Sequence, residues 1–107
     1  MGIIDIIKSK IKKDILNFEK IGIKNDWGIN KNNITDYLIE PKLEEYIDSS
    51  SNVRITLWTV LEEKGKNGYI IVYSEENEEF GLAIMDKNNE KIFLGIYGSF
   101  AETLYSM

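Results

Sequence analysis

Apolar residues recur at helical spacing over the first part of the chain. Ile4, Ile7, Ile11, Ile15 and Phe18 fall on one face of a helix with 3.6 residues per turn, and charged side chains cover much of the rest. The spacing therefore predicts an amphipathic helix over residues 3–20. Because β-branched isoleucine is a weak helix former, we expect this helix to depend on packing against the rest of the fold.

The second half of the chain has a different pattern, in which short runs rich in β-branched and aromatic residues are separated by polar turns. The runs cover residues 52–63, 69–73, 80–85 and 92–97. The run at 69–73 is apolar on both faces, which is typical of a central strand. The pattern predicts four strands joined as an antiparallel meander.

Residues 37–48 fit two structures. Their apolar side chains lie on one face of either a helix or a strand. Pro41 followed by glutamates would open a helix well, but it is also compatible with an edge strand. We favour an edge strand, because residues 49–52 are typical of a turn into the next strand. The sheet would then have five strands, and with a helix here it would have four.

The last predicted hairpin has a register that can be worked out from charge. A two-residue turn at 88–89 pairs Asp86 with Lys91, which places opposite charges across from each other. In residues 80–85, Gly81 and Ala83 form one face. Small side chains let another element approach closely, so we expect the N-terminal helix to pack on this face.

The end of the chain carries a helix start signal. Ser99 and Glu102 have the spacing of a capping box, which predicts a short C-terminal helix with Phe100 turned inward. The expected fold is α+β: an antiparallel four- to five-stranded meander covered by the N-terminal amphipathic helix, with a short C-terminal helix. Residues 1–107 are expected to form a single globular domain.

The composition of the chain excludes several common kinds of catalytic and metal-binding site. The chain has no histidine, no cysteine and a single arginine in 107 residues. It therefore lacks the commonest general base, the commonest metal ligand and the thiolate nucleophile. Phosphate-binding, dinucleotide-binding and serine-hydrolase motifs are also absent from the sequence. We expect no catalytic residue, metal site or cofactor, and a non-enzymatic role is favoured over an enzymatic one.

Charge and hydropathy indicate which partners and which cellular location to expect. The net charge of -5 would repel a phosphate backbone, so we expect no nucleic-acid partner. No apolar run is long enough to span a bilayer, and the N-terminus lacks the features of a signal peptide. The lack of cysteine fits a reducing compartment, which predicts a cytoplasmic protein. Homo-oligomerisation stays open.

The densest charge cluster lies in the predicted turn between residues 74 and 79. Glu75, Glu76, Glu78 and Glu79 form a candidate interface for a basic protein partner, or a divalent-ion site. The segment does not match the calcium-binding loop pattern. The competing interpretation is a solvated hairpin tip that keeps the sheet soluble.

A second candidate is the face of the strand that carries Arg54 and Trp58. With Thr56 between them, these side chains could form a polar-aromatic ligand face. The competing interpretation is a buried tryptophan and an arginine that extends along the sheet to solvent.

The N-terminal segment also shows a compositional resemblance. Residues 1–18, with their MGII opening and isoleucine–lysine pattern, resemble the short amphipathic peptides called phenol-soluble modulins. The resemblance implies a helix that lies on a membrane surface. We favour a helix that covers the sheet, because the same chain contains a sheet with two apolar faces, and we expect no membrane partner.

The sequence leads to two hypotheses about the function of the protein. The favoured one is a small acidic protein-binding module that binds a basic protein partner, like the bacterial immunity-type or antitoxin-like proteins. The alternative is a small-ligand-binding protein or carboxylate-based enzyme that uses the Arg54/Trp58 face of the sheet.

Overall fold

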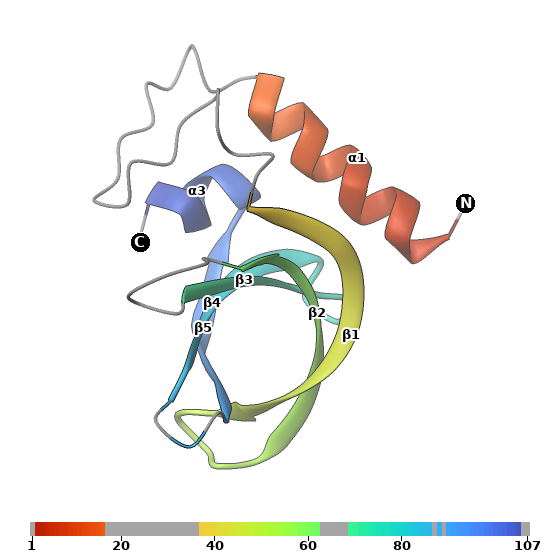
Figure 1. Ribbon diagram of the computed structural model, residues 1–107. Helices are drawn as coiled ribbons and strands as arrows, with labels where there is room; N and C mark the ends of the chain where they lie inside the picture. The colour runs from red at the N-terminus through yellow and green to blue at the C-terminus, as the bar shows by residue number, and fades with distance from the viewer. Residues whose placement is uncertain (1, 17–36, 63–68, 87, 89, 106–107) are drawn as a thin grey trace.

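The computed structural model describes residues 2–16, 37–62, 69–86, 88 and 90–105. Five strands follow an N-terminal helix and precede a short C-terminal helix (Figure 1). The elements are α1 (Ile3–Leu16), β1 (Leu38–Asp48), β2 (Arg54–Glu62), β3 (Tyr69–Ser74), β4 (Glu79–Met85), β5 (Lys91–Gly98) and α3 (Phe100–Tyr105). The α+β class is confirmed, and residues 17–20 of the predicted first helix lie outside the described residues.

The strands form a closed barrel in the order β1-β2-β3-β4-β5. Each strand runs antiparallel to the next, as expected for a meander. Five is an odd number, so the first and last strands point the same way, and the barrel closes through a parallel pairing of β1 with β5. The prediction of a purely antiparallel sheet is therefore wrong at this seam, where Ile47 pairs with Ile92 and Asp48 with Phe93.

Strand β1 settles the ambiguity at residues 37–48 in favour of a strand. It pairs with β2 along one side, and its last residues pair with β5 on the other. The strand is thus not a simple edge strand. Pro41 is buried and lies where the register with β2 shifts between Leu38 and Lys42. An irregularity of this kind tolerates the missing N–H of proline.

Two apolar clusters lie on opposite faces of the barrel wall. All five strands contribute to the inner cluster, which comprises Tyr46, Leu57, Ile70, Val72, Ala83 and Phe93. The outer cluster lies beneath the two helices and comprises Ile7, Ile11, Val60, Leu61, Ile71, Tyr73, Phe80, Leu82, Phe100 and Ala101. Because side chains alternate along a strand, β3 supplies both clusters and is buried on both faces, as its sequence predicted.

The predicted packing of α1 on Gly81 and Ala83 is wrong. The helix lies against α3 and β1, and its apolar side chains join Phe80 and Leu82 in the outer cluster, whereas Ala83 belongs to the inner cluster. The small residues do allow a close approach, but within the barrel. A Cβ atom on Gly81 would lie 2.4 Å from the carbonyl oxygen of Gly95 and 2.8 Å from the ring of Phe93.

The register predicted for the last hairpin is also wrong, by one residue. Lys91 pairs with Met85 and not with Asp86. The Asp86 carboxylate accepts hydrogen bonds from the backbone N–H groups of Asn88, at 2.8 Å, and Glu90, at 3.0 Å. These bonds stabilise a longer loop than the two-residue turn that charge pairing suggested.

The capping box at the last helix is confirmed. The Glu102 N–H donates to Ser99 Oγ at 3.0 Å, and the Ser99 N–H donates to Glu102 Oε1 at 3.4 Å. Phe100 is fully buried. The backbone N–H of Ala101 also donates to Asp14 Oδ2 at 3.0 Å, which ties α3 to α1. No helix among the described residues is long and apolar enough to cross a membrane.

Candidate functional site

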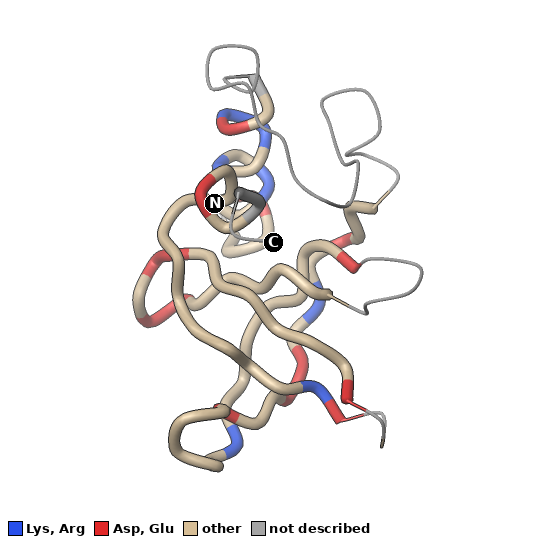
Figure 2. Tube along the Cα trace, turned by 90° about the vertical axis from the view of Figure 1, so that its left-hand side faces the viewer, with Lys and Arg blue, Asp and Glu red and all other residues tan. Residues whose placement is uncertain are grey.

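The acidic turn, defined as residues 75–79, projects from the barrel between β3 and β4 and is the red loop at the left of Figure 2. Ser74 Oγ accepts hydrogen bonds from the backbone and side-chain nitrogens of Asn77, at 3.3 and 3.2 Å. Glu78 adopts a left-handed backbone conformation with φ of 54°, which completes the reversal. Glu75, Glu76, Glu78 and Glu79 are all exposed.

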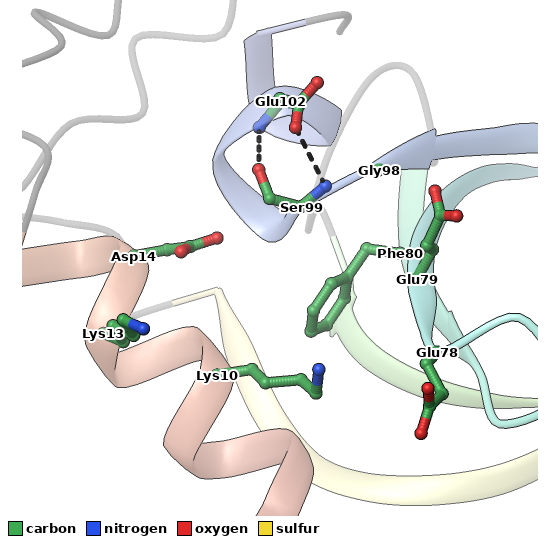
Figure 3. A pocket seen from close by; sticks show the side chains of 9 residues that line it. All are labelled: Lys10, Lys13, Asp14, Glu78, Glu79, Phe80, Gly98, Ser99 and Glu102. Carbon is green, nitrogen blue, oxygen red and sulfur yellow. Dashed lines mark hydrogen bonds between the residues drawn. The ribbon is translucent and has the colours of Figure 1, made fainter.

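The four glutamates do not share one surface, because the acidic turn stands between two clefts. Glu78 and Glu79 line the first, which we call the helix cleft, with a volume of about 450 Å³ (Figure 3). Lys10 and Lys13 of α1 line the same cleft, and Lys10 extends toward the acidic turn. Asp14 and Glu102 also line it, so the two lysines offset part of the charge of four carboxylates on this side.

The second cleft, which we call the mouth cleft, opens into the barrel on the other side of the turn, with a volume of about 580 Å³. Its lining comprises Leu43, Asp48, Ile55, Thr56, Leu57, Ser74, Glu75, Glu76, Asn77, Phe93 and Ile96. Three of these residues are acidic and none is basic. The cleft therefore combines an apolar floor, continuous with the inner cluster, with an uncompensated acidic rim.

The acidic rim is held in place by hydrogen bonds at two points. The indole Nε1 of Trp58 donates to Glu75 Oε1 at 2.8 Å, which fixes one end of the turn against β2. At the second point, the hydroxyl and backbone N–H of Ser50 donate to Asp48 Oδ1 at 2.7 and 2.9 Å. These bonds lower the pKa of Asp48, so its carboxylate is ionised at neutral pH.

The negative charge of the acidic turn affects Tyr73 in the neighbouring strand β3. Burial raises the pKa of Tyr73, and the charges of Glu78 and Glu75 raise it further. The amino group of Lys10 lies 5.9 Å from the centre of the same ring. Negative charge is thus concentrated on both sides of the turn, and within the described part of the chain the cations placed against it lie on the side of the helix cleft.

The structure does not bring the Arg54/Trp58 pair together. Both side chains belong to β2, but Trp58 lies four positions beyond Arg54, a separation along the strand of about 13 Å. Arg54 is exposed, and its Nη1 lies 3.2 Å from Glu45 Oε1. Arg54 and Glu45 line a surface depression whose lining does not include Trp58. Trp58 is half-buried and turned toward Glu75.

A polar network inside the barrel was not expected from the sequence. The Lys91 ammonium donates to the Glu44 carboxylate, and both side chains are less than a fifth exposed. Nearby, the hydroxyls of Tyr46 and Thr59 lie 2.5 Å apart. The one signal in the sequence was the two-residue spacing of Glu44 and Tyr46, because a strand that turns Tyr46 inward turns Glu44 to the same face.

The pKa of Glu44 reflects this surrounding. Burial by itself raises the pKa, but the hydrogen bond from Lys91, a weaker interaction with Thr59 and the charges of Lys91 and Lys42 outweigh it. The pKa therefore lies below its ordinary value of 4.5, although Oε1 makes no hydrogen bond of normal geometry. Burial also raises the pKa of Tyr46 well above its usual range, so this hydroxyl stays protonated.

No group of three or more metal-ligating side chains that could hold an ion occurs within the described ranges. Comparison with known proteins gives no match to a family model, to a curated protein or to a solved structure.

Proposed function

We propose that this protein is a small binding module that captures a basic protein partner at the mouth cleft. One observation carries the proposal: Asp48, Glu75 and Glu76 line a cleft with an apolar floor, and the described residues of that lining include no lysine or arginine. A surface of this kind favours cationic groups over anionic ones and offers apolar area to bury.

The two parts of the cleft would act at different stages of binding. The negative rim and the net charge of -5 would speed the approach of a positively charged partner. Leu43 is 52% exposed and lies at the cleft, where a large apolar side chain has no obvious structural use. Burial of this side chain and of the floor would slow dissociation.

We further propose that the module belongs among the cytoplasmic, immunity-type or antitoxin-like proteins of bacteria, which neutralise a basic protein by covering it. This part is supported by small size, acidic charge and the cleft, and by analogy with that class.

The test compares two double variants that change the net charge by the same amount. Glu75→Gln with Glu76→Gln alters the mouth cleft, whereas Glu78→Gln with Glu79→Gln alters the helix cleft. Each is used with the wild type to recover partners from a lysate of the source organism, and association rates are measured at several salt concentrations. We expect the first variant to associate about tenfold more slowly at low salt and the second to differ much less.

A different outcome would favour the alternative function. If no protein partner is recovered and the purified chain retains a small molecule, capture of a basic protein is the wrong description. Because Arg54 and Trp58 do not line one site, small-molecule binding at each of them would then be tested separately by Arg54→Ala and Trp58→Phe.

A further inference from the structure

We propose that the partner enters the mouth cleft as an extended segment and binds as an added β-strand along the free edge of β2. This inference rests on the proposed function and specifies how the partner binds. β1 pairs with β2 along residues 54–57, but the pairing of β2 with β3 reaches only to Trp58 opposite Tyr73. No described strand pairs with residues 54–57 on the β3 side.

The edge is free because the chain turns away from it. β3 ends at Ser74, which pairs with Glu79 of β4, and the acidic turn then reverses the chain. The hydrogen bond from Trp58 to Glu75 holds the turn beside β2, at the point where the ladder stops. Beyond that point, Ile55, Thr56 and Leu57 line the mouth cleft.

An unpaired strand edge is a template for another strand. In an antiparallel ladder, alternate residues direct N–H and C=O toward one neighbour and the intervening residues direct theirs toward the other. The free half of β2 therefore presents backbone donors and acceptors to the cleft, and such edges bind extended peptides by strand addition. A volume of about 580 Å³ leaves space for several residues there.

The two faces of the edge indicate the sequence of the partner segment. Ile55 and Leu57 face the inner side, toward Phe93 and Ile96, so apolar side chains of an added strand would enter the barrel mouth. Thr56 faces the outer side, where Glu75 lies. Since side chains alternate along a strand, the complementary segment alternates apolar and basic residues.

The test uses synthetic hexapeptides with blocked termini and the full chain labelled with 15N. The first peptide alternates lysine and valine, the second has the same composition in two blocks, and the third is the alternating peptide with every second backbone nitrogen methylated. We expect the alternating peptide to bind about tenfold more tightly than either control, because the controls lose the side-chain alternation or the backbone hydrogen bonds. Backbone amides within residues 54–57 should gain protection from hydrogen exchange only with the alternating peptide.

A pair of variants adds a matched control. Thr56→Lys places a cation at the edge, where it blocks strand addition and repels the peptide. Leu94→Lys makes the same change of charge on the outside of β5, at a residue that is 39% exposed and does not line the mouth cleft. We expect about a tenfold loss of affinity for Thr56→Lys and little change for Leu94→Lys. If Thr56→Lys fails to fold, binding of the methylated and unmethylated peptides to the wild type still tests whether the peptide is held by backbone hydrogen bonds.

Three results would overturn the inference. Equal, salt-dependent binding of all three peptides would show capture of cations without strand addition, and the proposed function would stand. Protection of residues 54–57 that appears without peptide and disappears on dilution would show that a second copy of the chain occupies the edge. If no peptide binds at millimolar concentration, the edge of β2 does not bind basic segments. The proposed function would then be tested separately, by recovering protein partners with the two double variants.

Discussion

Gly81 lies where the barrel wall leaves no room for a side chain. The nearest atom to a Cβ at this position is a backbone oxygen of β5, which cannot move aside as a flexible side chain could. The Phe93 ring fills the remaining space, and Ala83 completes the same inner surface. At this level β4 and β5 therefore pack closely, with two small residues of β4 beside one large ring of β5.

At this position we expect Gly81→Ala to lower the free energy of unfolding by about 1–3 kcal/mol, because the added methyl group must displace the backbone of β5. Denaturant titration measures the change. Gly2→Ala is the control, since the nearest described atom to its Cβ would be Asp5 Oδ2, at the ordinary contact distance of 3.9 Å. Equal stability of Gly81→Ala and the wild type would mean that the barrel is less tightly closed here than the structure shows.

At the scale of elements, local signals predicted most of what the structure contains. Period-two alternation identified the strands, and the capping box identified α3, because both depend on residues close together in sequence. The register of the last hairpin depended on the Asp86 carboxylate turning back onto its own loop, which charge pairing could not reveal. The side of the sheet that α1 covers was missed because a small-residue face suits a barrel interior as well as a helix.

For α3, the capping box gives a quantitative expectation. Ser99→Ala should cost about 0.5–2 kcal/mol, since the Glu102 N–H loses its acceptor at the first turn. Glu102→Ala should cost less, because its bond to the Ser99 N–H is longer, at 3.4 Å, and exposed. Thermal unfolding of the two variants and of Ser99→Thr, which keeps a hydroxyl, measures the difference. A Ser99→Thr variant as unstable as Ser99→Ala would remove capping as the explanation.

At the scale of the whole molecule, the closure of the barrel depends on a short seam reinforced by charge. The parallel ladder between β1 and β5 has two residue pairs, and the ion pair between Glu44 and Lys91 joins the same two strands inside the barrel. Neither could be predicted from the sequence, because they join residues far apart in the chain and depend on how far the strands shear around the barrel. The mouth cleft was missed for the same reason: its lining comes from separate strands that only closure brings together.

The ion pair makes the stability of the barrel depend on pH. The pKa of Glu44 in the folded state lies below 4.5, so its contribution to stability is complete above that pH and is lost as the pH falls through the lower, folded-state value. We expect Glu44→Gln to be less stable than the wild type at neutral pH and to lose less further stability on acidification. Unfolding free energies measured from pH 7 to pH 2 test this, and parallel curves for the two proteins would contradict it. Glu45→Gln, at the exposed neighbouring residue, is the control.

The parallel pairing of β1 with β5 also predicts the order in which the strand pairs form during folding. The other strand pairs join neighbours along the chain, whereas the seam joins Ile47 to Ile92, 45 positions apart. Bringing such distant residues together costs chain entropy before their contacts repay it, so the hairpins should form early and the seam late. A weakened seam should then speed unfolding while leaving the refolding rate almost unchanged, which stopped-flow kinetics of Glu44→Gln can measure. By this account the barrel opens first along the line where it closed last, between its first strand and its final one.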